Sequence, residues 1–164
     1  MRVLVSGGGS GIGASACLRI AEAAFARGVQ PMIAVCGHKL NASQEGVVRS
    51  IQSMGGTAIA LVGDLGDPDV PGRLVGDAVA EFGGLDALVA NAGIASPGAI
   101  CDLSLEDWDH MFSVNLRGAW LLAKESYPHL KRSRGTACFT NGSVDSACSD
   151  LPSARTSGRC ADGT

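Results

Sequence analysis

Short apolar runs alternate with longer amphipathic segments along most of the chain. The short runs are rich in valine, isoleucine, leucine and alanine and lie at 3–5, 31–36, 57–62, 85–90 and 136–140. Between them, apolar residues recur at helical spacing in four segments, at 14–27, 41–54, 74–82 and 104–127. This alternation is typical of βαβ units, in which buried parallel strands are joined by covering helices. The pattern therefore predicts an α/β fold with five parallel strands.

Residues that start and stop helices support these limits. Gly28 and the pair 83–84 follow apolar stripes and are expected to end helices. Ser104 and Asp107 form a capping box that opens the fourth helix, and Pro128 is expected to end it. Right-handed crossovers then predict a Rossmann-type doubly wound sheet in the order 3-2-1-4-5. We expect one domain over 1–150 and an irregular tail over 151–164, which has no apolar period.

The composition excludes several classes of partner and site. The 164 residues include 46% apolar residues and 23 glycines, as expected for a covered sheet with many tight turns, and the net charge is −3. The small negative charge without a basic block argues against nucleic acid or a membrane surface as partner. The six cysteines are scattered without a metal-ligand spacing, so neither zinc nor a disulfide framework is expected. No apolar run is long enough for a signal peptide or a membrane span, and a cytoplasmic location is predicted.

A glycine-rich loop joins the first strand to the first helix. The segment VSGGGSGIG at 5–13 places Gly7, Gly11 and Gly13 in the spacing G-x-x-x-G-x-G. A loop of this kind, between a strand and a helix N-terminus, can press bare backbone amides against a phosphate group. We expect a dinucleotide pyrophosphate to bind there, with Ser6, Ser10 and Ile12 beside the glycines. A merely flexible turn is the alternative.

Several motifs resemble those of the short-chain dehydrogenase/reductase family, in the family's order over residues 3–146. The family's loop reads T-G-x-x-x-G-x-G, with Ser6 here in place of the threonine. The resemblance implies that Asp64 and Leu65 meet the adenine ring. It also implies that the N-A-G motif, which consists of Asn91, Ala92 and Gly93, lines the cofactor cleft. It implies catalytic roles for Asn115, in the long helix, and for Ser143, after the fifth strand.

Two of these residues also have local interpretations. Asn115 shares a helical stripe with Trp108 and Phe112, and an amide on an apolar face needs a partner or a water. Either local backbone satisfies it, or, as the resemblance implies, it holds a water of a proton relay. Asp64 could equally cap the next helix.

Cofactor choice depends on the residues after the second strand. An acidic side chain there would bind a ribose 2′-hydroxyl and repel a 2′-phosphate. The chain has Gly37, His38 and Lys39 instead, so two potentially cationic side chains stand where a carboxylate is absent. This favours NADP, with His38 as a contact, and leaves NAD possible because both residues could simply be solvated.

The resemblance implies hydride transfer between the nicotinamide and a small carbonyl or alcohol substrate. It also implies a tyrosine about a dozen residues after Ser143 and a lysine four residues later, but the region near Arg155 offers neither. Tyr127 is assigned a packing or surface role, because it is expected at the end of the long helix and the nearest lysines, Lys124 and Lys131, are taken to be at the wrong spacing. We interpret the catalytic pair as absent and the chain as inactive as written.

An abrupt change of composition at about 154 suggests a truncated or frameshifted product that lacks the family's later strands. The fifth strand is then an exposed sheet edge. A non-catalytic dinucleotide-binding or interaction module and a non-functional remnant are the alternative hypotheses. Relatives commonly pair through the long helix, so a homo-oligomer through 104–127 is a further possibility.

Overall fold

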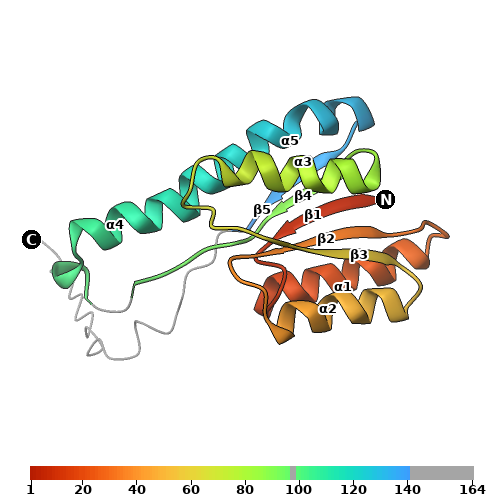
Figure 1. The fold of residues 1–164 in the computed structure, drawn as a ribbon, viewed down its shortest axis with the longest axis horizontal. Helices are drawn as coiled ribbons and strands as arrows, with labels where there is room; N and C mark the ends of the chain where they lie inside the picture. The colour runs from red at the N-terminus through yellow and green to blue at the C-terminus, as the bar shows by residue number, and fades with distance from the viewer. Residues whose placement is uncertain (97–98, 141–164) are drawn as a thin grey trace, which may run out of the picture.

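The computed structural model describes residues 1–96 and 99–140, and its sheet has the predicted order. Five parallel strands lie in the order β3-β2-β1-β4-β5 (Figure 1). Their bounds are Arg2–Ser6 (β1), Met32–Gly37 (β2), Thr57–Val62 (β3), Ala87–Ala90 (β4) and Thr136–Phe139 (β5). The five predicted strands and the doubly wound Rossmann fold are confirmed.

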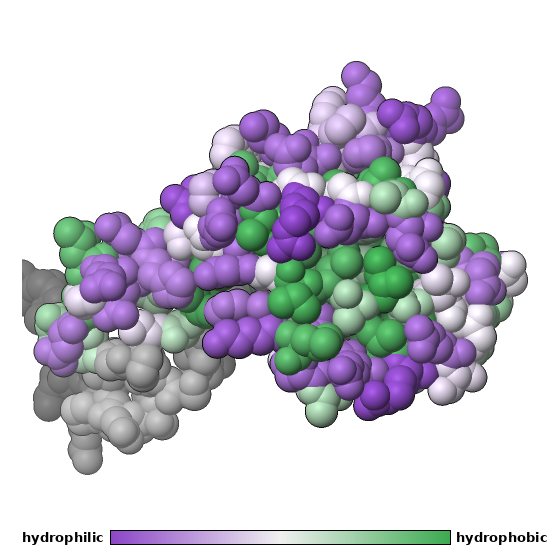
Figure 2. Space-filling model, viewed as in Figure 1, coloured by the Kyte–Doolittle hydropathy of each residue, from purple (hydrophilic) through white to green (hydrophobic). Residues whose placement is uncertain are grey.

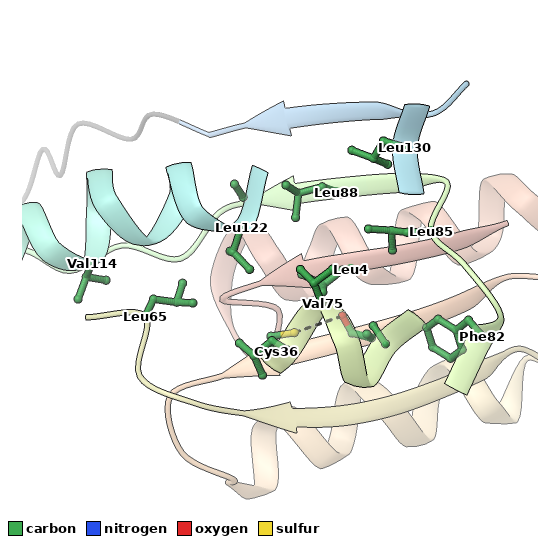
Figure 3. Close-up of a cluster of buried hydrophobic side chains, with 14 residues drawn as sticks. Leu4, Cys36, Leu65, Val75, Phe82, Leu85, Leu88, Val114, Leu122 and Leu130 are labelled. Carbon is green, nitrogen blue, oxygen red and sulfur yellow. Dashed lines mark hydrogen bonds between the residues drawn. The ribbon is translucent and has the colours of Figure 1, made fainter. Parts of the chain in front are cut away.

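Helices cover both faces of the sheet (Figure 1). Helices α1 (Gly11–Phe25) and α2 (Ala42–Ser53) lie on one face, and α3 (Val70–Phe82) and α5 (Ala119–Ser133) lie on the other. Side chains alternate between the two faces along each strand. In β1, Val3 and Val5 therefore join the cluster under α1 and α2, whereas Leu4 joins the cluster under α3 and α5 that Figure 3 shows.

The predicted helix over 104–127 has a different course. The structure has a short 3-10 turn, η1 (Ile100–Asp102), then α4 (Leu105–Phe112), a widened π-helical segment η2 (Ser113–Gly118), and α5. Ser104 is confirmed as the N-cap, because its Oγ accepts the backbone N–H of Asp107 at 3.0 Å, while the Asp107 carboxylate accepts the Ser104 hydroxyl at 2.6 Å and not the backbone N–H of a full capping box. The prediction that Pro128 ends the helix is wrong.

Burial explains why the helix continues past Pro128. A proline inside a helix removes one backbone hydrogen bond, which is unfavourable. Leu122 and Leu130, on either side of Pro128 in sequence, are both buried against the sheet, and the helix has to continue to place Leu130 there. Apolar packing therefore outweighs the lost bond, and α5 ends only at Arg134, which has a left-handed φ of 56°.

The edges of the sheet differ in exposure. All four residues of β5 are exposed and this strand pairs with β4, as the prediction of an uncovered fifth strand requires for the described part of the chain. On the opposite edge, Figure 2 shows apolar side chains along the half-buried strand β3. Of the helices that the structure describes, none has the length and apolarity needed to cross a membrane.

Four cysteines lie in the described ranges, and all are free thiols. Cys17 and Cys36 are buried, whereas Cys101 and Cys138 are exposed. Burial raises the pKa of the Cys17 thiol to about 12 and raises the pKa of Cys36 as well. Across residues 1–96 and 99–140, no group of histidine, cysteine and carboxylate side chains could hold a metal ion.

A charged pair joins the starts of β1 and β4. Arg2 donates through Nε to Asp86 Oδ2 at 3.1 Å, and the Asp86 side chain is 30% exposed. The hydrogen bond from Arg2 lowers the pKa of Asp86 below its ordinary value of 3.8. A carboxylate with a lowered folded-state pKa stabilises the fold above its unfolded-state pKa, and this contribution is lost as the pH falls through the folded-state pKa.

We therefore expect Asp86→Asn to be less stable than the parent chain at pH 7, with a difference that shrinks as the pH falls below about 4. Denaturant unfolding at a series of pH values measures this. Asp77→Asn is the control, because its partner Arg73 is 3.5 Å away and both side chains are about half exposed, so little change is expected at any pH. A difference for Asp86→Asn that stays constant down to pH 2 would contradict the prediction.

Candidate dinucleotide-binding site

The glycine loop leaves the N-terminus of α1 open. Gly7 and Gly11 have left-handed φ values of 65° and 52°, which a glycine adopts without strain. Ser10 occupies the N-cap position, but its side chain makes no capping hydrogen bond. The first backbone N–H groups of a helix have no partner within the helix. A phosphate group fits these free amides and the positive end of the helix dipole.

Close packing leaves no room for a side chain at Gly7 or Gly13. A Cβ atom at Gly13 would overlap the carbonyl oxygen of Gly7 and lie 2.6 Å from Asn91 Nδ2, and a Cβ at Gly7 would lie 2.9 Å from Ala92 Cα. Gly11 differs, because nothing lies within 4 Å of a Cβ built there. The loop is therefore pressed against the segment after β4 on one side and has a bare backbone facing open space on the other. These features fit a bound pyrophosphate.

Ser6 ties the loop to the N-A-G segment. Its Oγ accepts the backbone N–H groups of Asn91 and Ala92, both at 3.0 Å, and Ser6 is 1% exposed. Asn91 returns two bonds, from Nδ2 to the carbonyl oxygens of Ser6 at 3.2 Å and Gly7 at 3.3 Å. Asn91 Oδ1 also accepts the hydroxyl of Thr140 at 3.0 Å. The carboxyl ends of β1, β4 and β5 are thus held together by side chains.

The predicted site residues surround two adjoining hollows at the carboxyl edge of the sheet. One is lined by residues of the β1, β2, β3 and β4 ends, including Ser6, His38, Asp64, Leu65 and Ala92. The other is lined by the glycine loop and the N-A-G segment, including Ser10, Gly11, Ile12, Asn91 and Asn115. Gly7, Ala92 and Gly93 line both.

Among the predicted site residues that the structure describes, Gly13 lines neither hollow. Gly13 lies beneath the loop and shapes it from below. Ser143 lies outside the described residues, as does the expected tail over 151–164. The structure therefore brings together the predicted cofactor residues and Asn115, and its description stops short of the predicted serine.

Asn115 has its partner in the backbone after β4. Its Oδ1 accepts the N–H of Ile94 and its Nδ2 donates to the carbonyl of Ile94, both at 2.8 Å. The amide is therefore satisfied by backbone, but by a segment 21 residues earlier in the sequence and not by the local backbone that one interpretation expected. The relay water stays a prediction. Asn115 lies in η2, and its stripe neighbours Trp108 and Phe112 are partly exposed and stack at 4.4 Å.

Asp64 is not a helix cap. Its Oδ1 accepts the N–H of Gly66, two residues later, at 2.8 Å, and the N-cap of α3 is Asp69. The bond to Gly66 shapes the turn that follows β3, and Asp64 lines the first hollow together with Leu65. Its alternative interpretation as a capping carboxylate is wrong.

The prediction that Lys131 lies at the wrong spacing from Tyr127 is wrong. They are four residues apart, which is the Tyr-x-x-x-Lys spacing, so the spacing is present in the sequence. Their position excludes the role: Tyr127 follows Asn115 by twelve residues, a rise of about 18 Å along a helix leading away from the site. Tyr127 is 61% exposed, and Lys131 Nζ lies 5.9 Å from its ring centre. The surface location is as predicted.

The residues at the site that the sequence interpretation missed include His110, Thr140 and Ile94. His110, on α4, lines the first hollow, and Thr140 and Ile94 line the second. Thr140 follows the fifth strand directly, so its place at the carboxyl edge could have been predicted from the strand assignment. His110 had no such signal, because its approach depends on the course of α4 in space.

A parallel five-stranded sheet, a glycine loop before an open helix N-terminus and hollows at the carboxyl edge define a dinucleotide-binding protein of the Rossmann type. The family model for short chain dehydrogenases matches residues 1–148. The chain belongs to the short chain dehydrogenase family.

Named relatives agree with this assignment. The chain is 36% identical over 149 residues to a probable tetrahydroxynaphthalene reductase of Zymoseptoria tritici, covering 91% of this chain and 53% of that protein. It is 37% identical over 142 residues to versicolorin reductase 1 of Aspergillus parasiticus, covering 82% and 52%. The chain thus spans about half the length of the curated relatives that it matches.

Solved structures are similar to the same extent. A short chain dehydrogenase from Burkholderia cenocepacia in complex with NADP superposes with a TM-score of 0.72 at 36% identity, covering 79% of this chain and 50% of that one. A 3-ketoacyl-ACP reductase from Sinorhizobium meliloti gives a TM-score of 0.73 at 36% identity, covering 84% and 52%.

Proposed function

We propose that this chain binds NADP(H) as the dinucleotide-binding part of a reductase that transfers hydride between the nicotinamide and a small carbonyl or alcohol substrate. One observation carries the proposal: the uncapped N-terminus of α1, with the bare backbone of Gly11, faces a hollow shared with the N-A-G segment. The amides there would hold the pyrophosphate. Asp64 and Leu65 would border the adenine in the neighbouring hollow.

The subsite for the ribose supports NADP over NAD. A hollow between the glycine loop and the end of β2 is lined by Ser10, Gly37, His38 and Lys39 among others. The described residues that line this hollow include no carboxylate, whereas an acidic side chain is what a 2′-hydroxyl site offers. His38 and Lys39 would attract a 2′-phosphate. The family member from Burkholderia cenocepacia was solved with NADP, which supports the same choice.

Hydride chemistry, which the nicotinamide supplies when bound, needs a proton donor at the substrate oxygen. In this chain we propose Ser143 as the residue that orients the oxygen, and Asn115 as the residue that holds a relay water near η2. The positions about a dozen residues after Ser143, near Arg155, hold no tyrosine. We therefore expect the 164-residue chain to bind cofactor without reducing carbonyl substrates. Relatives named as reductases support the substrate class.

The missing tyrosine also favours a second candidate, a dinucleotide-binding module that acts through a partner. Pairing of two copies through the α4–α5 region belongs to this proposal. Its support is the exposed side chains of Phe112, Leu116 and Trp120, which line one groove on this region. A cytoplasmic location, consistent with free thiols, remains part of the proposal.

Titration with NADPH and NADH tests the binding. We expect NADPH to bind at least about tenfold more tightly than NADH, because the two cationic side chains contribute roughly 1.4 kcal/mol or more to the 2′-phosphate. Replacing both His38 and Lys39 by alanine should remove the preference while NADH affinity stays within about twofold. Lys124→Ala, on the exposed face of α5, is the control.

Failure of both dinucleotides to bind a cooperatively folded chain would refute the proposed function. Equal affinities for the two would refute the choice of NADP alone. NADPH oxidation with a carbonyl substrate, abolished by Ser143→Ala, would show that the chain is catalytic and overturn the expected inactivity.

A further inference from the structure

Gln44 is a buried polar side chain beneath the ribose subsite. It lies in the first turn of α2, and its backbone N–H is capped by Asn41 Oδ1 at 2.9 Å. A glutamine at this position commonly reaches back to the backbone of the cap. Here the side chain turns into the sheet instead and is 0% exposed. Its Nε2 donates to the carbonyl of Val35 at 2.8 Å and to that of Leu61 at 2.9 Å, which ties the carboxyl ends of β2 and β3 together.

These two bonds fix the direction of the amide. Turning it over would place Oε1 against two carbonyl oxygens, which are acceptors only. Oε1 therefore points away from Val35 and Leu61, and it has no hydrogen-bond partner within the described ranges. A methionine would fill a similar volume without burying an unpaired oxygen. The two donated bonds, and not packing alone, are therefore what a glutamine supplies here.

The amide occupies the space that a side chain at position 37 would need. A Cβ built at Gly37 would lie 2.9 Å from Gln44 Oε1 and 3.2 Å from its Cδ. The aliphatic part of Gln44 packs as closely against the glycine loop, because a Cβ at Gly9 would lie 3.1 Å from Gln44 Cβ. A residue larger than glycine at 37 would thus push aside an amide held by two hydrogen bonds in a buried position.

We propose that Gln44 is a specificity-determining residue of the dinucleotide site, which acts by reserving the end of β2 for glycine. Gly37 ends β2, where an acidic side chain would bind a ribose 2′-hydroxyl. By excluding that carboxylate, Gln44 leaves the basic side chains of His38 and Lys39 at the hollow and so favours a 2′-phosphate. The inference rests on the proposed binding of a dinucleotide.

A double-mutant cycle on the full chain tests the inference. The variants are Gly37→Asp, Gln44→Ala and the two combined, and the measurements are the thermal midpoint and the affinities for NADPH and NADH. We expect Gly37→Asp alone to lower the midpoint by roughly 5 °C or more, because it displaces the buried amide. In the Gln44→Ala background the same change should lower it by less than half as much. In the Gln44→Ala background, Gly37→Asp should also shift the NADPH-to-NADH affinity ratio at least tenfold toward NADH.

Gly46→Asp provides the matched control. It adds the same charge on α2, at a position where nothing lies within 4 Å of a built Cβ, so its effect should be the same with and without Gln44→Ala. Equal losses from Gly37→Asp in both backgrounds would overturn the inference. So would a double variant that keeps the parent's affinity ratio while the parent binds NADPH. A parent chain that binds neither dinucleotide would instead refute the proposed function, and the midpoint cycle would still report whether Gln44 excludes a side chain at 37.

Discussion

Replacing Gly13 with alanine is expected to destabilise the chain by about 1–3 kcal/mol and to abolish measurable dinucleotide binding. The added Cβ would overlap the carbonyl oxygen of Gly7. The obstacle is backbone, so no side-chain rotation can relieve it, and either the loop or α1 has to move. Movement of the loop would displace the amides that are proposed to hold a pyrophosphate. Denaturant unfolding and titration with NADPH measure the two effects.

Gly46→Ala is the matched control for this variant. Gly46 also lies in a helix, and a Cβ there would meet nothing within 4 Å. The ordinary helical preference for alanine over glycine should then apply, with a gain of about 0.5–1 kcal/mol. The same chemical change is thus expected to have opposite signs at the two positions. A stabilised Gly13→Ala chain would show that the close approach to Gly7 is not as the structure has it.

Replacing Ser6 with alanine is expected to lower the free energy of unfolding by about 2–4 kcal/mol. Ser6 Oγ is the acceptor for two backbone N–H groups, those of Asn91 and Ala92. Both donors would lose their partner in a site that is closed to water at Ser6, and each unsatisfied group costs about 1–3 kcal/mol. Because these bonds hold the glycine loop against the N-A-G segment, NADPH affinity should fall with stability.

Two further variants test whether the effect of Ser6→Ala comes from its lost hydrogen bonds or from the loss of any buried hydroxyl. Ser6→Thr keeps the acceptor and should retain both stability and binding to within about 1 kcal/mol. Ser126→Ala removes another fully buried hydroxyl, one with no partner in the described part of the chain, so it should be neutral or slightly stabilising. If Ser6→Ala and Ser126→Ala behaved alike, the proposed tie between β1 and β4 would be wrong.

Local patterns predicted the parts of the fold that local forces decide. The apolar runs placed all five strands, and the strand over 57–62 has the observed bounds. Handedness and short connections then determined the sheet order. The error at Pro128 has the opposite origin. The loss of one helical bond is visible in the sequence, whereas the burial of Leu130 that outweighs it depends on where the sheet lies.

The candidate site likewise has parts that could be predicted from the sequence and parts that could not. The glycine loop and the N-A-G segment could be placed because both follow strands, and parallel strands bring their carboxyl ends to one edge. The partner of Asn115 could not, since Ile94 lies 21 residues away in the sequence. The role of Gln44 could not be predicted either, since its side chain bonds to the backbone of β2 and β3.

The location of the two tryptophans determines what their fluorescence can report. Trp108 is 44% exposed on α4 and Trp120 is 57% exposed on α5, so both indoles are in contact with solvent in the native protein. Unfolding changes their surroundings little, and their emission should already be shifted to long wavelength before denaturant is added. Loss of the sheet and its helices is therefore better followed by far-ultraviolet circular dichroism, while quenching of the two indoles reports on α4 and α5 together.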